Sequence, residues 1–300
     1  MLTNKVFAPD YERTDEGWIL YPTDVELRKR VFGQVRKHQA KMNLHLLGSI
    51  VDYVSEPEER IMDNMAGTGS ILIAALAGRR VTMIEISEKY SGWIKEHLDY
   101  METIAPGISS SVILINAPCQ RVLPIPTNHI IFSPPYTNIM QKKKFSAGDI
   151  TADLYGVDED DFTEYSKQPL NVGNRNRFLY SQEMEKIYKL CYESVLPGGT
   201  MTVVIKDYIE QGQRVCLSTW VQRVCTKAGF LPAEPNKTWF KWKAPGSAFT
   251  NIYRSQGKLV VDDEDIMIFI KPEQPVKADL PAGYTVFAES RVVRQLVHAL

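Results

Sequence analysis

The chain has 300 residues, of which 44% are hydrophobic and 24% are charged, and its net charge is −1 at pH 7. This composition indicates a globular protein with a sizeable core and excludes a chain that carries a global basic field. The longest apolar runs are too short to span a bilayer, and the first residues lack the pattern of a secretory signal. We therefore expect a cytoplasmic protein that makes no contact with a membrane.

Helix and strand patterns alternate along most of the chain. After an irregular arm, helices are predicted at residues 24–54, 71–77, 88–101, 182–195 and 218–228. Strands are predicted at residues 60–64, 81–86, 112–115, 129–132, 201–206, 238–243 and 265–270. This alternation predicts a single α/β domain over residues 1–300 with a seven-stranded, mostly parallel sheet and an antiparallel edge strand.

Residues 137–180 are polar and show no helical or strand period. A segment of this length is too long for an ordinary connection between two elements, so we interpret it as a functional insert.

Four cysteines are scattered along the chain without C-x-x-C spacing. The spacing predicts free thiols in a reducing compartment and no metal site.

A Gly-rich turn, Ala66-Gly67-Thr68-Gly69-Ser70, follows the first predicted strand and precedes a helix. Glycine in such a turn lets a ligand approach the backbone, and helix N–H groups are expected to point at that ligand. Leu72 stands where a dinucleotide fingerprint would have its third glycine. Glu85 ends the next strand, where an acidic side chain can accept hydrogen bonds from ribose hydroxyls. The turn therefore favours a nucleoside cofactor without a pyrophosphate. The alternative is a strand–turn–helix corner that binds no ligand.

The stretch HIIFSPPYTN, residues 129–138, ends an apolar strand in Ser133-Pro134-Pro135-Tyr136. Proline has no backbone N–H group and cannot continue a sheet. Taken alone, the stretch fits either a strand with a rigid stop or a catalytic segment.

Three motifs in compatible order resemble those of the amino-group DNA methyltransferases. Ser133–Tyr136 is similar to motif IV, (D/N/S)-P-P-(Y/F/W), and the stretch from Asp63 to Ser70 is similar to motif I, often D-P-F-A-G-S-G-T. Asn64 and Met65 depart from the usual Pro and Phe. The stretch at residues 38–54 is similar to motif X, often H-P-A-K-F followed by a helix.

The resemblance implies a Rossmann-like class I methyltransferase fold and S-adenosyl-L-methionine as the cofactor, with no metal. The catalytic residues it implies are Ser133, Pro134, Pro135 and Tyr136. The cofactor-binding residues it implies are Lys41, Asp63, Met65, Ala66, Gly67, Thr68, Gly69, Ser70, Glu85, Asn116, Ala117 and Ser133. Asn116-Ala117 departs from the family's usual G-D-A. In this family the Pro-Pro backbone presents a carbonyl to the exocyclic amine, and the aromatic residue stacks on a flipped base.

The sequence Pro118-Cys119-Gln120 resembles the nucleophile motif of the cytosine-C5 methyltransferases. It follows the third strand and not the fourth, and no Glu-Asn-Val tripeptide occurs in the chain. We therefore interpret Cys119 as an ordinary cysteine.

Serine at the first position of motif IV favours cytosine N4 as the target within the family. Adenine N6, an amino group in RNA, and a non-catalytic subunit that binds cofactor or DNA stay open. Double-stranded DNA is the expected partner, together with a possible cognate restriction endonuclease.

Two segments carry the cations that could contact DNA. The insert at residues 137–180 is the candidate target-recognition region. It has aromatic residues interleaved with basic ones, and its candidate DNA-binding residues are Lys142, Lys143, Lys144, Arg175 and Arg177. An acidic stretch at residues 158–161 argues against a uniformly basic face. Residues 236–258 are basic and aromatic and form the second candidate.

Overall fold

The computed structural model describes residues 5–35, 41–135, 168–233, 239–244 and 248–273. An eight-stranded sheet has the order β3-β2-β1-β4-β5-β10-β8, and β9 also pairs with β10. Its strands are β1 (Arg60–Asp63), β2 (Arg80–Glu85), β3 (Val112–Asn116), β4 (Thr127–Phe132), β5 (Val195–Ile205), β8 (Leu231–Pro232), β9 (Phe240–Lys243) and β10 (Asp263–Ile270).

The first five strands pair in parallel, whereas β10 runs antiparallel to β5, β8 and β9. This is the predicted Rossmann-like class I methyltransferase fold, with its antiparallel pairing at one end of the sheet. All seven predicted strands are present, and the short β8 makes the eighth.

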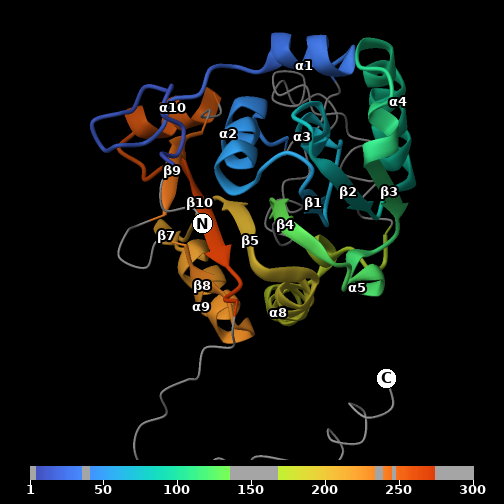
Figure 1. Ribbon diagram of the computed structural model, residues 1–300. Coiled ribbons are helices and arrows are strands. Elements are labelled where there is room, and N and C mark those ends of the chain that lie inside the picture. Colours follow the sequence, from blue (N-terminus) through green and yellow to red (C-terminus); the bar gives the residue numbers. More distant parts are fainter. Residues whose placement is uncertain (1–4, 36–40, 136–167, 234–238, 245–247, 274–300) are drawn as a thin grey trace, which may run out of the picture.

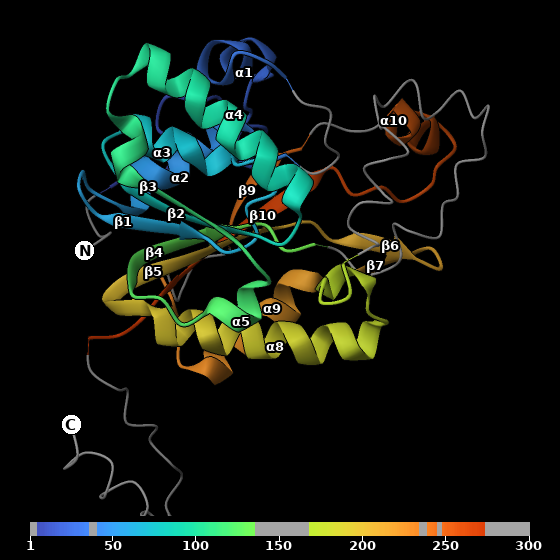
Figure 2. The same cartoon turned by 90° about the vertical axis from the view of Figure 1, so that its right-hand side faces the viewer.

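Helices cover both faces of the sheet (Figures 1 and 2). One layer contains α1 (Val25–Phe32), α2 (Leu44–Val54), α3 (Ile73–Leu76) and α4 (Glu88–Ile104), and the other contains α5 (Cys119–Val122), α8 (Arg177–Ser194) and α9 (Leu217–Ala228). Strand side chains point alternately to the two faces. In β10, Ile266 and Ile268 accordingly join the core under the first layer, and Met267 and Phe269 join the core under the second.

The predicted helix at residues 24–54 is in fact two helices. The first, α1, ends at Gly33, whose φ of 72° is left-handed. The second, α2, begins after Asn43, whose Oδ1 accepts hydrogen bonds from the backbone N–H groups of His45 and Leu46. A C-terminal glycine and an N-terminal Asn are the signals that separate them.

Strand β5 begins directly after α8 and includes the turn Pro197-Gly198-Gly199. A side chain at Gly199 would place its Cβ 2.1 Å from the carbonyl oxygen of Asn128. Glycine is therefore needed there so that β5 can lie against β4 at the register shift between Thr127 and His129.

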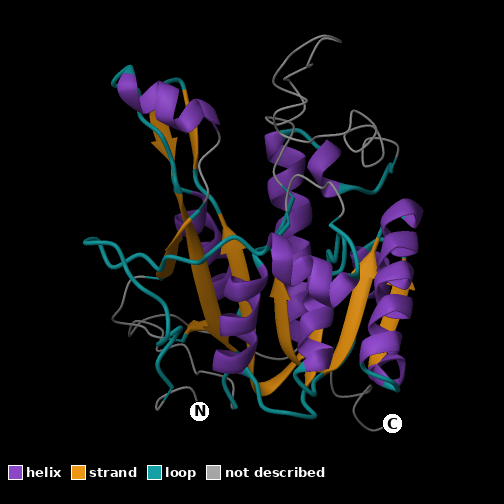
Figure 3. Ribbon diagram, turned by 90° about the horizontal axis from the view of Figure 1, so that it is seen from above, coloured by secondary structure: helices purple, strands orange, loops and turns teal. Residues whose placement is uncertain are grey.

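Besides the short elements α5 and β8, two further features were not predicted from the sequence. One is the hairpin of β6 (Tyr208–Glu210) and β7 (Gln213–Val215), and the other is α10 (Ala248–Ser255). Figures 2 and 3 show both beyond the carboxyl ends of the parallel strands. They therefore flank the edge where ligands bind in open α/β sheets.

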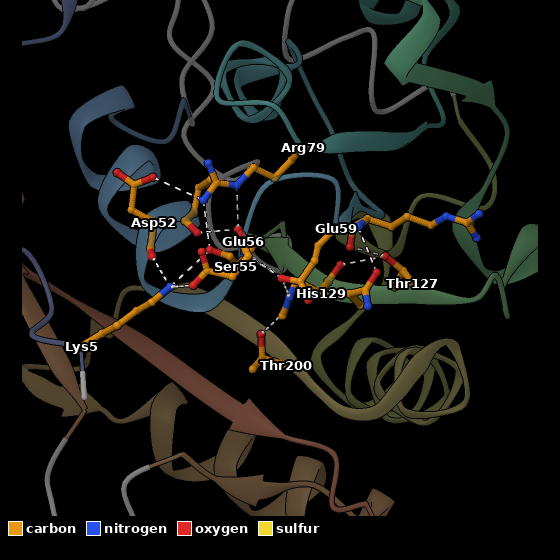
Figure 4. A network of polar contacts seen from close by, with 12 residues as sticks. Lys5, Asp52, Ser55, Glu56, Glu59, Arg79, Thr127, His129 and Thr200 are labelled. Atoms are coloured by element: carbon orange, nitrogen blue, oxygen red, sulfur yellow. Dashed lines mark hydrogen bonds and ion pairs between the residues drawn. The ribbon is translucent and has the colours of Figure 1, made fainter. Parts of the chain in front are cut away.

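A network of polar contacts lies at the other end of the parallel strands, away from their carboxyl ends (Figure 4). His129 lies with Nδ1 2.9 Å from Thr200 Oγ1 and with Nε2 3.0 Å from Glu59 Oε2. Burial lowers the pKa of His129, and the nearby Glu59 opposes that shift. Buried polar groups with partners of this kind fix the register of the strands they join.

None of the helices in the described ranges combines the length and the apolar character needed to cross a bilayer.

Candidate active site

Three parallel strands end in polar residues, and a fourth is followed by one. Asp63 ends β1, Glu85 ends β2 and Asn116 ends β3, while Ser133 follows β4 directly. Glu85 is paired with Asn116, and Asp63 is paired with Met83. Because parallel strands place their carboxyl ends at one edge, the fold brings these predicted site residues to the same edge of the sheet.

Glu85 is held in place by the backbone around it and is 2% exposed. Its Oε2 accepts a hydrogen bond from the Gly67 N–H group at 2.7 Å, and its Oε1 accepts one from the Ser87 N–H group at 2.8 Å. Burial and, to a smaller extent, the charge of Asp63 raise the pKa of Glu85 to about 7, and the two N–H groups oppose the shift. The carboxyl group is therefore oriented, and it titrates near neutral pH.

The carbonyl oxygen of Glu85 joins β2 to the end of β3. It accepts a hydrogen bond from Asn116 Nδ2 at 2.8 Å and another from the Ala117 N–H group at 3.0 Å. The donating side of the Asn116 amide therefore faces β2, and Oδ1 lies on the other side of the amide.

Asp63 is the second carboxyl group at this edge. Its Oδ1 accepts a hydrogen bond from the Met65 N–H group at 3.0 Å, and burial raises its pKa to about 7. The mutual repulsion of Asp63 and Glu85 disfavours two negative charges together. A cationic ligand would relieve that repulsion.

Four N–H groups of the Gly-rich turn donate hydrogen bonds within the protein. Besides the bonds to Asp63 and Glu85, the Ala66 N–H group donates to the Ile84 carbonyl oxygen at 3.0 Å, and the Gly69 N–H group donates to the Ala66 carbonyl oxygen at 2.8 Å. The amides of Met65, Ala66, Gly67 and Gly69 thus have partners. An anion such as pyrophosphate would not find these four donors available.

Gly69 is required by backbone geometry and by packing. Its φ is +75°, and an added Cβ would lie 2.8 Å from Ile94 Cγ1 on α4. The glycine thus allows α4 to pack against the turn, a role that glycine also has in dinucleotide folds.

Arg28 is a residue of this region that sequence reasoning missed. It is 4% exposed, and it donates hydrogen bonds to Ser70 Oγ at 3.1 Å and to the Met42 carbonyl oxygen at 2.5 Å. The spacing of Asp24 and Arg28 indicates an ion pair along a helix, and Arg28 Nε lies 2.8 Å from Asp24 Oδ2. Nothing in the sequence indicates the contact with Ser70.

The other predicted cofactor-binding residues lie around this turn. Thr68 is 5% exposed, and its carbonyl oxygen is 3.1 Å from His97 Nδ1. Lys41 is half-buried and directly precedes Met42. The helix predicted after motif X is α2, while residues 36–40 lie outside the described ranges.

The Ser-Pro-Pro segment leaves the sheet at the end of β4. The last paired residue of β4 is Phe132, opposite Val203 of β5. Pro134 is buried, and Ser133 and Pro135 are half-buried. Tyr136 lies outside the described residues, so its predicted stacking role stays a prediction.

The predicted DNA-contacting cations of the insert are described only in part. Lys142, Lys143 and Lys144 lie outside the described residues. Arg175 Nη2 donates to the Pro169 carbonyl oxygen at 3.1 Å. Arg177 begins α8 and lies 3.2 Å from Glu210 Oε2 on the hairpin, in an ion pair whose side chains are 65% and 44% exposed. The last residues of the predicted insert therefore belong to a helix.

In the second candidate segment, three cations are paired within the protein. Lys241 lies 2.7 Å from Asp263 Oδ2 and 2.6 Å from Asp265 Oδ1. Lys243 and Arg254 both form ion pairs with Asp262. These pairs neutralise much of the basic charge that the sequence places here.

Cys119 is buried, and burial raises the pKa of its thiol to about 12. The thiolate form that a nucleophile needs is therefore scarce at neutral pH. The interpretation of Cys119 as an ordinary cysteine agrees with this, and all four cysteines are free, as predicted.

Comparison with known proteins finds no matching family model and no matching curated protein. Similar solved structures include TrmN from Thermus thermophilus, with 12% identity, a TM-score of 0.43, and coverage of 78% of this chain and 50% of that one. The chain thus spans half the length of that protein. A methyltransferase from Pyrococcus furiosus has 14% identity, a TM-score of 0.49, and coverage of 83% and 94%. A magnesium protoporphyrin IX methyltransferase from Synechocystis PCC 6803 with bound SAM has 11% identity, a TM-score of 0.45, and coverage of 82% and 90%.

Proposed function

We propose that the chain is an S-adenosylmethionine-dependent methyltransferase that transfers a methyl group to the exocyclic N4 amine of cytosine in double-stranded DNA. The observation that carries this proposal is the position of Ser133-Pro134-Pro135. The segment leaves β4 at the edge of the sheet where Asp63, Glu85 and the Gly-rich turn also lie. A nucleoside cofactor and an amine-binding segment would therefore meet at this edge.

The charge of the edge supports this cofactor. S-adenosylmethionine carries an ammonium and a sulfonium group and no pyrophosphate. Asp63 and Glu85 offer two carboxyl groups whose raised pKa values reflect burial without a cation. In the proposal, Glu85 accepts hydrogen bonds from the ribose hydroxyls through its remaining lone pairs, and Asp63 faces the methionine part. When bound, the cofactor supplies an electrophilic methyl group.

The Ser-Pro-Pro segment supports the reaction at an amine. The nitrogen of an exocyclic amine is a poor nucleophile, because its lone pair is delocalised into the ring. In the proposal, the Pro134 carbonyl oxygen and the Ser133 hydroxyl accept hydrogen bonds from the amine and aim its lone pair at the methyl group. Rate enhancement then comes from orientation. Tyr136 provides the face for a flipped base.

Cytosine N4 is proposed over adenine N6 because of Ser133 at the first motif position. The test is incubation of the protein with labelled S-adenosylmethionine and double-stranded DNA, followed by mass spectrometry of the nucleosides. Labelled N4-methylcytosine is the expected product. Labelled N6-methyladenine alone would overturn the choice of base, label in RNA alone would overturn the choice of nucleic acid, and cofactor binding without any transfer would favour a non-catalytic subunit.

A matched pair of variants controls this test. Tyr136→Ala removes the proposed stacking face and is expected to lower transfer about 5- to 150-fold with little change in cofactor affinity, because stacking contributes about 1–3 kcal/mol per base. Cys119→Ala, outside the proposed reaction, is expected to retain transfer.

A further inference from the structure

Two segments far apart in sequence meet at Arg28, at the carboxyl-terminal end of the Gly-rich turn. One is the segment at residues 41–43, which precedes α2, and the other begins at Ser70, where the turn enters its helix. Arg28 Nη2 holds the first through the Met42 carbonyl oxygen, and Nη1 holds the second through Ser70 Oγ. A planar guanidinium group fixes both acceptors in one geometry.

The arginine is itself fixed by Asp24. Asp24 Oδ2 accepts hydrogen bonds from Arg28 Nε at 2.8 Å and from the Leu44 N–H group, at the start of α2, at 2.9 Å. Asn43 adds a bond from its Nδ2 to the Pro22 carbonyl oxygen at 2.9 Å. Residues 42–44 are therefore bonded to α1 and to the segment before it at successive positions.

We propose that Arg28 is a positioning residue of the cofactor site, which holds the Gly-rich turn and the segment at residues 41–43 in register with each other. It acts through Ser70 and Met42. This inference depends on the proposed cofactor, and it does not depend on the base that is methylated.

Removal of the guanidinium group leaves buried Ser70 and half-buried Asp24 without their donor. Ser70 is 9% exposed, and the Asp24 side chain is 16% exposed. An unpaired polar group away from water costs free energy, so the chain around it is expected to rearrange until the group has a new partner or reaches water. The rearrangement would fall on the two segments that flank the proposed methionine end of the cofactor.

Arg79 offers a matched control. Among the described residues it is the other buried arginine, at 7% exposed, and it also bonds to a serine and to a backbone carbonyl. Its Nε donates to Ser55 Oγ at 3.1 Å, and its Nη2 donates to the Ser55 carbonyl oxygen at 3.0 Å. Figure 4 shows this arginine in the network that includes His129, which lies away from the carboxyl ends of the strands. Its loss should weaken the fold without moving the cofactor turn.

The experiment is isothermal titration of the full chain with S-adenosylhomocysteine, at a temperature where each variant is folded by circular dichroism. Arg28→Met is expected to raise Kd at least about 10-fold, which corresponds to about 1.4 kcal/mol. Arg79→Met is expected to stay within about 2-fold of wild type although its melting temperature falls. Arg28→Lys keeps the positive charge but lacks the planar guanidinium group with its several donors. Its Kd should lie between the values for wild type and Arg28→Met.

A double-mutant cycle tests the route through Ser70. Ser70→Ala is expected to raise Kd about 3-fold in wild type and to have a smaller effect in Arg28→Met, because the shared hydrogen bond is already lost. If Arg28→Met does not fold, Arg28→Lys and Ser70→Ala decide the matter. An unchanged Kd in both, or an equal rise in Arg79→Met, would overturn the inference. A wild-type chain that binds no S-adenosylhomocysteine would instead overturn the proposed function.

Discussion

Glu85 is a buried carboxyl group whose ionisation should control cofactor affinity. The ionised form accepts hydrogen bonds from hydroxyls, and burial raises its pKa to about 7. Affinity for S-adenosylhomocysteine should therefore rise as the pH increases from 6 to 8, by up to ~10-fold per pH unit below the pKa. Titration calorimetry at several pH values measures this dependence. Glu85→Gln should bind more weakly at pH 8 and show a flatter profile, and an equally steep profile in this variant would contradict the assignment.

The same two carboxyl groups affect the stability of the protein without ligand. The pKa values of Asp63 and Glu85 are raised in the folded state, so their contribution to stability is fully present below the unfolded pKa values. It is lost as the pH rises through about 7. Bound ligand should stabilise the protein most at the alkaline end of this range.

Gly69 and Gly92 form a matched pair for testing the turn. Gly69→Ala should destabilise the protein by about 1–3 kcal/mol, because its φ is +75° and its Cβ would meet Ile94 on α4. Gly92 lies inside α4 with nothing within 4 Å of an added Cβ, so Gly92→Ala should stabilise by up to about 1 kcal/mol. Urea unfolding measures both changes. A neutral Gly69→Ala would show that the turn can relax.

At the scale of elements, Arg214 holds the β6–β7 hairpin to the body of the sheet. It lies 2.8 Å from Asp207 Oδ2, after β5, and 2.8 Å from Asp263 Oδ2, on β10. Arg214→Ala should cost about 1–3 kcal/mol, because buried Asp207 loses its cation while Asp263 keeps Lys241. Arg177→Ala breaks only the exposed pair with Glu210, and it should cost less than about 1 kcal/mol. Equal costs in chemical denaturation would show that the hairpin is not held by Arg214.

His129 joins β4 to β5 and to the residue before β1. Burial lowers its pKa in the folded state, so its contribution to stability is present above the unfolded pKa of about 6.5 and is lost as the pH falls through the folded pKa. His129→Gln should be less stable at pH 7 by about 1–3 kcal/mol, because Thr200 and Glu59 lose a partner. It should also show a flatter stability profile between pH 7 and pH 5. Thermal unfolding across this range makes the comparison, and parallel profiles would contradict the role of His129.

At the scale of the whole molecule, the sequence predicted the parallel strands and the edge that carries the site. Apolar runs that end in Asp63, Glu85 and Ser133 mark strands whose carboxyl ends meet, so local pattern was sufficient there. The sequence could not predict Arg28, because its contact with Ser70 joins residues 42 positions apart. The β6–β7 hairpin was missed because its strands are three residues each, too short for a period to be read.

The central claim is that a Ser-Pro-Pro segment at the end of β4 directs a methyl group onto cytosine N4. The most direct measurement is mass spectrometry of nucleosides from double-stranded DNA after incubation with the chain and labelled S-adenosylmethionine. We predict labelled N4-methylcytosine, with transfer lowered in Ser133→Ala or Tyr136→Ala and retained in Cys119→Ala. Labelled N6-methyladenine without N4-methylcytosine, or no labelled nucleoside from a chain that binds the cofactor, would contradict the claim.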